Sequence, residues 1–304
     1  MNREMKMKLA PIALFTYNRP WHTRQTVEAL CRNIHADKSE LFIFSDGPKT
    51  DADAGAVSEV RQYIRRVSGF KQVEILEQER NLGLAQSIID GVTGLVRQHG
   101  RVIVVEDDIV TSPYFLQFIN EALERYENDD RVMHVSGYML PISPDDLPET
   151  FFYRAFSCWG WGTWQRAWQH FRKDVHAARA AFPRSRRKEF NLGGCFDFWS
   201  QLEENAQGKR DTWAVFWYVT IFLRNGLCLH PSRSLVQNIG YDGSGTHCPG
   251  NNNFCVSLAD EPVRFFEPVI GENREALARI QSYYASIKPS LMSRLRFRAR
   301  RALS

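Results

Sequence analysis

Three consecutive acids, Glu106-Asp107-Asp108, directly follow the apolar run Val102–Val105. A short run of this kind is typical of a strand that is buried on both faces of a parallel sheet. Carboxylates crowded at the end of such a strand repel one another, and a divalent cation with a phosphate-bearing ligand would relieve that repulsion. An exposed acidic loop is the alternative. Because Ile109 follows at once and ligands bind at the carboxyl ends of strands in open α/β sheets, we favour a metal-assisted ligand site.

The elements that would position these acids alternate between strand and helix over the first 138 residues. The apolar pattern predicts strands at residues 11–16, 41–44, 73–76, 102–105 and 132–135. Helical spacing predicts helices near residues 27–34, 57–67, 84–96 and 115–126, the last with Ser112 as N-cap and Pro113 at its first position. This alternation predicts an α/β fold with a mainly parallel sheet flanked by helices. Residues 16–19, 46, 80–83 and 106–108 each follow a strand, so we expect them at one edge of the sheet.

Composition and charge exclude several classes of protein. Hydrophobic residues make up 43% of the 304 residues and charged residues 24%, which is ordinary for a globular protein. Six basic residues lie in the last 17 positions; without them the formal net charge falls from +4 to −2, so a nucleic-acid groove is not expected.

The same sequence predicts a compartment. We see no apolar run of about 18 residues and no apolar signal-peptide core, and the six cysteines form no CxxC pair. The expectation is a cytoplasmic protein with reduced thiols and no zinc site.

Six motifs in order carry a family resemblance. They are Thr16-Tyr17-Asn18-Arg19, Ser45-Asp46-Gly47, Arg80-Asn81-Leu82-Gly83, Glu106-Asp107-Asp108, Gly160-Trp161-Gly162 and Asp211-Thr212-Trp213. The chain resembles GT-A glycosyltransferases, particularly the inverting N-acetylglucosaminyltransferase I type and related bacterial family-2-like enzymes. The resemblance is strong over residues 10–138 and continues in order afterwards. It implies a nucleotide-sugar-binding sheet with an aromatic-rich acceptor side.

The resemblance also implies roles for individual residues. The nucleotide-sugar donor would be bound by Thr16, Tyr17, Asn18, Arg19, Asp46, Arg80, Asn81, Gly83, Glu106 and Asp107, with Asp46 accepting a hydrogen bond from the base and Glu106 and Asp107 holding the ribose and sugar. Asp108 would be the direct ligand of Mn²⁺ or Mg²⁺. Asp211 matches the catalytic base, although the N-acetylglucosaminyltransferase I pattern has paired acids before the tryptophan and here Thr212 follows Asp211.

The chemistry can be argued without the family. Displacing a sugar from a nucleoside diphosphate builds negative charge on the leaving phosphate, which a divalent cation stabilises. The acceptor hydroxyl must lose its proton as it attacks, and a carboxylate on the opposite face of the sugar can take it. One base without an enzyme nucleophile implies inversion at the anomeric carbon.

Several of these residues have simpler interpretations that the sequence leaves open. Asp46 before Gly47 could only stabilise a turn, and Arg80–Gly83 could only be a turn that opens a helix. Asp211 could be the N-cap of a following helix.

Aromatic and histidine side chains add two further candidates. Most tryptophans are expected in the core, but Trp159 and Trp161, which flank Gly160, could form a wall against a sugar. His247 lies in a glycine-rich stretch and could approach the metal when that loop closes over the donor; a histidine with no such role is the alternative.

The sequence therefore predicts three regions. Residues 1–140 would form the donor-binding α/β half, residues 141–275 the acceptor-binding half with the catalytic base, and residues 276–304 a basic helix or tail. That tail could be disordered, or it could attach the enzyme to an anionic membrane surface on the cytoplasmic side.

The predicted function is an inverting, metal-dependent transfer from a nucleotide sugar, UDP-linked in our interpretation, to a glycan or glycolipid acceptor of surface polysaccharide synthesis. Two alternatives are a non-catalytic carbohydrate-binding protein on a transferase fold and a sugar-nucleotide pyrophosphorylase. The second would need a glycine-rich phosphate loop after the first strand, where this chain has Thr16-Tyr-Asn-Arg-Pro20.

Overall fold

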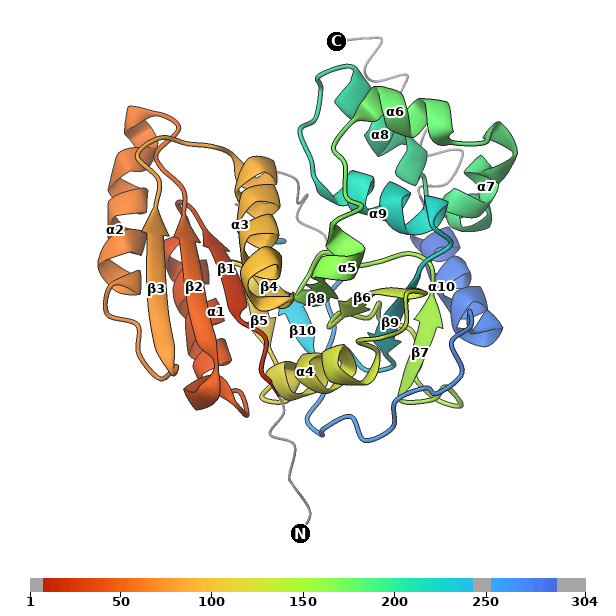
Figure 1. Ribbon diagram of the computed structural model, residues 1–304, viewed down its shortest axis with the longest axis horizontal. Helices are drawn as coiled ribbons and strands as arrows, with labels where there is room; N and C mark the ends of the chain where they lie inside the picture. Colours follow the sequence, from red (N-terminus) through yellow and green to blue (C-terminus); the bar gives the residue numbers. More distant parts are fainter. Residues whose placement is uncertain (1–7, 243–252, 289–304) are drawn as a thin grey trace.

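Two sheets and the helices around them make up the computed structural model, which describes residues 8–242 and 253–288 (Figure 1). The strands of the described residues are β1 (Ile12–Thr16), β2 (Glu40–Ser45), β3 (Gln72–Glu77), β4 (Arg101–Glu106), β5 (Ile109–Thr111), β6 (Val132–Ser136), β7 (Thr150–Tyr153), β8 (Trp161–Trp164), β9 (Leu227–Pro231) and β10 (Val236–Asn238). The helices are α1 (Pro20–Cys31), α2 (Ala54–Ile64), α3 (Leu84–His99), α4 (Phe115–Arg125), α5 (Gln165–Trp168), α6 (Val175–Ala181), α7 (Arg187–Phe190), α8 (Phe198–Ala206), α9 (Ala214–Leu223) and α10 (Arg274–Ile287), with 3₁₀ turns at Ala36–Lys38, Asp51–Asp53, Arg184–Arg186 and Leu192–Gly194.

The large sheet has eight strands in the order β3-β2-β1-β4-β8-β6-β9-β7. Strands β3, β2, β1 and β4 are mutually parallel, whereas β8 runs antiparallel between β4 and β6. This mixed, mainly parallel sheet flanked by helices confirms the predicted α/β class. Strands from both sides of residue 140 share the sheet, and the three predicted regions stay a prediction.

The register explains where a ligand site can form. Thr16 pairs with Ser45, Ser45 with Glu77, and Phe15 with Glu106, so the carboxyl ends of four parallel strands lie level with one another. All of β1 is buried, and so is β4 up to its last residue, Glu106. The polar segments that follow these apolar strands thus lie at one edge of the sheet, as the sequence predicts.

A second sheet of two strands joins the halves of the chain. β10 runs antiparallel to β5, with Asn238 opposite Ile109. Because β5 begins immediately after Asp108, this pairing brings the residues that follow β10 against the acids.

Helix α4 corrects one detail of the sequence analysis. It begins at Phe115 with Tyr114 as its N-cap, and Ser112 is not the cap. The Ser112 hydroxyl accepts the backbone N–H of Tyr114 at 3.3 Å and donates to the carbonyl of Ala259, 2.7 Å away. The side chain therefore contacts both the segment before the helix and a distant part of the chain.

The second half places an aromatic core beside the sheet. Helix α9 is buried over Val215–Phe222 and packs against α6 and α8, which lie with it at the top right of Figure 1. No helix in the described part of the chain is long and apolar enough to cross a membrane.

Candidate active site

The acids lie at the carboxyl end of a buried strand, as expected: Glu106 is the last residue of β4, and Asp107 and Asp108 form the turn into β5. Asp107 and Asp108 are 9% and 8% exposed, which is low for carboxylates. The backbone N–H of Tyr17 donates to Asp107 Oδ2 at 3.3 Å, and the Thr26 hydroxyl donates to the Asp107 carbonyl at 2.8 Å. The acids are therefore fixed to the segment after β1 and to helix α1, and they do not form an exposed loop.

Arg19 lies among these carboxylates. Its guanidinium is 2.7 Å from Asp108 Oδ2 and 4.0 Å from Asp107 Oδ1, and it lies 3.7 Å from Asp242 Oδ1. The predicted proximity of Arg19 to the acids is confirmed. The guanidinium supplies one positive charge to a cluster with a larger formal negative charge.

Burial and mutual repulsion shift the pKa values of two of these acids. Burial, followed by the charges of Asp108 and Asp107, raises the pKa of Glu106 well above its usual value. Burial and the charge of Asp108 likewise raise the pKa of Asp107 to about 7, and Arg19 opposes both shifts. Further positive charge at this position would stabilise the ionised acids.

The donor set fits a divalent cation held jointly with a phosphate ligand. Asp108 Oδ1 is buried and has no hydrogen-bond partner in the structure. Among the described residues, no group of three or more His, Cys, Asp or Glu side chains is arranged to hold a metal. Mg²⁺ is commonly bound by one or two carboxylates while substrate phosphates and water complete its ligands, so a single free carboxylate oxygen suits that mode.

Two residues of this site, Asp242 and His22, were missed from the sequence. His22 Nε2 lies 3.0 Å from Asp242 Oδ2, and burial is the main cause of a lowered pKa of His22. Asp242 follows strand β10 and precedes Gly243, which is the same pattern that identified Asp46. The signal was thus present, but only the β5–β10 pairing shows that this strand ends beside Asp108.

Gly240 is required for this approach. A Cβ atom at residue 240 would lie 2.2 Å from Asp108 Oδ2 and 2.9 Å from both terminal nitrogens of Arg19. The backbone after β10 therefore fits against the Arg19–Asp108 pair only because residue 240 has no side chain.

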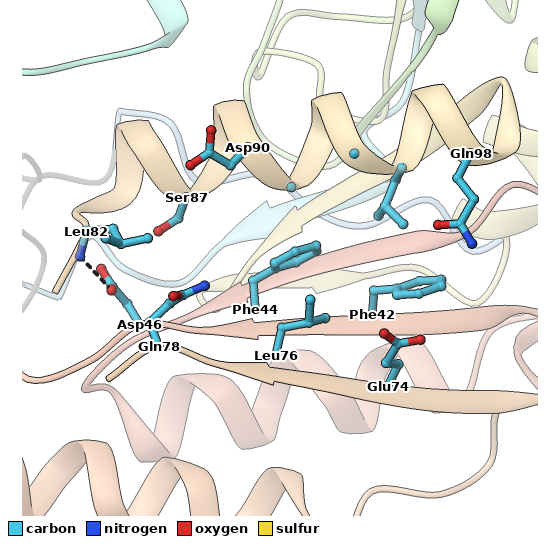
Figure 2. A pocket seen from close by; sticks show the side chains of 13 residues that line it. Phe42, Phe44, Asp46, Glu74, Leu76, Gln78, Leu82, Ser87, Asp90 and Gln98 are labelled. Carbon is cyan, nitrogen blue, oxygen red and sulfur yellow. Dashed lines mark hydrogen bonds between the residues drawn. The ribbon is translucent and has the colours of Figure 1, made fainter. Parts of the chain in front are cut away.

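Asp46 organises the neighbouring turn. Its carboxylate accepts backbone hydrogen bonds from Gly47 at 2.9 Å, Leu82 at 2.8 Å and Gly83 at 2.9 Å. Figure 2 shows the contact with Leu82. The turn-stabilising interpretation of Asp46 is confirmed, and its contact with a nucleotide base stays a prediction.

The rest of that turn is held by close backbone contacts. Asn81 Nδ2 donates to the Gly47 carbonyl at 2.9 Å, and a Cβ on Gly47 would meet the Arg80 backbone at 2.6 Å. Gly83 has φ +79° where it caps α3, a conformation that favours glycine. The Arg80 side chain is exposed at this edge.

The other predicted residues after β1 contact their own chain. The Thr16 hydroxyl donates to the Phe44 carbonyl at 3.4 Å, and Asn18 Nδ2 donates to Asp53 Oδ1 at 2.9 Å. The Tyr17 hydroxyl accepts the Lys49 N–H at 3.0 Å. These contacts fix the loop at the strand ends, and the donor contacts of all three stay predictions.

The two candidate tryptophans differ in burial. Trp159 is half-buried, and its ring meets Tyr138 at 4.5 Å and Tyr241 at 5.6 Å. Trp161 is 0% exposed and stacks on Trp213 at 5.2 Å. The prediction that Trp161 forms a wall against a sugar is wrong, because a strand residue packed on both sides cannot touch a sugar. For Trp159 this role stays a prediction.

The predicted base lies apart from these contacts. Asp211 is exposed and forms an ion pair with Lys173. Helix α9 has Trp213 as its N-cap, so the alternative that Asp211 caps this helix is wrong. His247 lies outside the described residues.

Comparisons with known proteins identify the family. A family model described as Glycosyl transferase family 2 matches residues 12–190, more than half of the chain. No curated protein sequence matches.

Solved structures show only distant similarity. A mannosyltransferase, PcManGT from Pyrobaculum calidifontis in complex with GDP-Man and Mn²⁺, is 12% identical, covers 73% of each chain and has a TM-score of 0.38. TarS from S. aureus is 13% identical, covers 41% of this chain and 21% of its own, and has a TM-score of 0.29. At such scores neither structure assigns a residue role here.

Proposed function

The chain belongs to glycosyl transferase family 2, and on this premise we propose that it transfers a sugar from a UDP-linked donor with inversion and with the help of a divalent cation. As a family member it is a glycosyltransferase that uses a nucleotide sugar. This assignment replaces the two alternatives drawn from the sequence, a non-catalytic binding protein and a pyrophosphorylase.

One observation carries the proposal: the end of β4 crowds more buried carboxyl groups together than the single charge of Arg19 can balance, which raises the pKa of Glu106 and Asp107. Asp108 would hold Mn²⁺ or Mg²⁺ through its unpartnered oxygen, and the cation would stabilise charge on the leaving diphosphate. Arg19 would bind the diphosphate, since its planar guanidinium suits phosphate oxygens.

The other residues of the chain would orient the reactants. Thr16–Asn18 and the turn at residues 80–83 border the same edge and would enclose the nucleoside. Trp159 would pack against a sugar ring. Asp211 would accept the proton of the attacking hydroxyl, for which it must be released from Lys173.

The proposal also includes the acceptor and the place where it is modified. A glycan or glycolipid acceptor would be presented at the cytoplasmic face of a membrane, to which the basic end of the chain would attach. Most of that segment, residues 289–304, lies outside the described residues.

The experiment is a donor screen with a matched variant. UDP-, GDP-, CMP- and dTDP-sugars are tested with Mn²⁺ by thermal shift and by release of the nucleotide. We expect stabilisation by a UDP-sugar with Mn²⁺, and loss of both responses in Asp108→Asn. Asp37→Asn, at an exposed position before the amino end of β2, is the control and should respond like wild type. Unchanged turnover in Asp108→Asn would refute the metal role.

A further inference from the structure

A cavity of about 340 Å³ opens between helix α3 and strands β2 and β3 (Figure 2). Helix α3 packs on β1 and β4, so it leaves part of the outer sheet face uncovered. The lining residues are Phe42, Phe44, Asp46, Glu74, Leu76, Gln78, Leu82, Ser87, Asp90, Gly91, Gly94, Leu95 and Gln98. Its volume lies in the range of small-molecule sites, roughly 300–1,000 Å³.

The floor of the cavity is flat and apolar. Phe42, Phe44 and Leu76 project from the two strands toward the helix, as Figure 2 shows. The Phe44 ring is stacked on Phe15, with centroids 4.9 Å apart and planes 13° apart, which fixes its orientation. A planar apolar group could lie on this floor.

Two glycines of α3 shape the roof in different ways. A Cβ on Gly91 would lie 2.8 Å from the Phe15 ring and 3.0 Å from the Phe44 ring, so the helix touches the sheet at this residue. A Cβ on Gly94, one turn later, would meet nothing within 4 Å. The cavity is therefore open at Gly94, where an ordinary side chain would fill it.

The polar groups around the cavity have one sign of charge. Glu74 and Asp90 are exposed carboxylates in the lining, and no Lys, Arg or His is among the described residues that line it. The Ser87 hydroxyl oxygen is buried without a hydrogen-bond partner and points from α3 into the cavity (Figure 2). This charge pattern disfavours phosphate-bearing ligands, and the cavity holds no arginine of the kind that Arg19 supplies beside Asp108.

We propose that the cavity binds a small organic cation with a flat apolar body. The apolar body lies on Phe42 and Phe44, the cationic group lies near Glu74 on β3, and a polar edge bonds to Ser87. Asp90 on α3 adds negative charge on the other side of the cavity (Figure 2). The proposal does not depend on the transferase activity, because the residues assigned to the ligand, Phe42, Phe44, Glu74, Ser87 and Asp90, are not donor-site residues; the cavity shares only its Asp46 end with the predicted donor site.

Two probes of the same shape test the charge preference. 1-Naphthylmethylammonium and 1-naphthoate share one ring system and differ in the sign of their charge. Isothermal titration with the full-length protein should give saturable binding of the cation and at least about ten-fold weaker binding of the anion. Equal affinities, or no saturable binding of the cation at millimolar concentration, would overturn the proposal.

Two variants locate the binding. Gly94→Leu places a side chain in the open space and should weaken binding of 1-naphthylmethylammonium at least about ten-fold. Gly55→Leu is the control, since Gly55 is also a helical glycine, on α2, with nothing within 4 Å of its Cβ position. Similar effects of both variants would place the binding elsewhere.

A surface variant covers the case in which Gly94→Leu does not fold. Glu74→Gln combined with Asp90→Asn changes only exposed side chains. It should reduce the affinity for the cation to that for the anion, and an unchanged affinity for the cation would contradict the proposed ligand class.

Discussion

Arg19 shows what single side chains contribute to this site. It contacts Asp108 and Asp242, two acids that are 134 residues apart in the chain and adjacent only through the β5–β10 pair. Its position therefore depends on acids from two distant parts of the chain, of which the sequence analysis grouped only residues 106–108 with Arg19.

Asp242→Asn tests the second partner. Because Asp242 ties both Arg19 and His22 to the segment after β10, we expect the donor KM to rise about three- to ten-fold while kcat changes less. Steady-state kinetics with varied donor measure this split, with exposed Asp260→Asn as the control. A loss confined to kcat would instead place Asp242 in the chemical step.

Asp211→Asn and Lys173→Gln together test the base. If Asp211 is the base, its substitution should leave nucleotide binding intact and lower kcat by about 10²-fold or more, whereas Lys173→Gln should retain transfer. If the two residues form only a surface ion pair, both variants should lose less than about 1 kcal/mol of stability and no activity. Single-turnover transfer and urea unfolding distinguish these results.

Helix α3 shows how closely one element fits on the sheet. Gly91 and Gly94 are both helical, yet only a Cβ at residue 91 would clash with the sheet. Gly94→Ala should raise the free energy of unfolding by about 0.5–1 kcal/mol, since alanine is the better helix former. Gly91→Ala should lower it, because Phe15 and Phe44 must move. Urea unfolding of both variants measures the difference; stabilisation by both would show that α3 does not fit closely on the sheet.

Most strands and helices of the first half could be predicted because they bury an apolar run or a regular apolar pattern. Residues 101–106 and 84–99 are examples in which period and burial agree with the sequence. The short strands β5, β8 and β10 could not be predicted, because three or four residues carry no period and their pairing depends on distant segments. The proposal that Trp161 forms a wall against a sugar failed for the same reason, because the pairing that buries β8 between β4 and β6 could not be predicted.

The whole molecule contains a buried histidine whose proton uptake affects folding. His134 Nε2 lies 3.1 Å from the Ser157 carbonyl, and its Nδ1 accepts from the Trp217 indole at 3.3 Å, which suits the neutral ring. Burial, with the nearby His230 second, lowers the pKa of His134 well below its usual value.

This histidine should make stability depend on pH. Below about pH 6.5 the unfolded chain binds a proton at His134 that the folded chain excludes, so the free energy of unfolding falls as pH decreases. His134→Gln should reduce this slope by up to about 1.4 kcal/mol per pH unit between pH 6 and 5. Urea unfolding at several pH values measures it, with His176→Gln on the surface of α6 as control. Identical slopes in wild type and His134→Gln would contradict the assignment.

The insertion of β8 beside β4 has a consequence for how the protein is made. While the chain leaves the ribosome, the free edge of β4 has no neighbour until residues 161–164 have emerged, and unpaired edges promote aggregation. The acid cluster gains Asp242 later still. Nascent chains of this enzyme thus pass through a long interval in which β4 and the acids at its end lack their final neighbours, and slow translation over that interval would prolong their exposure to chaperones.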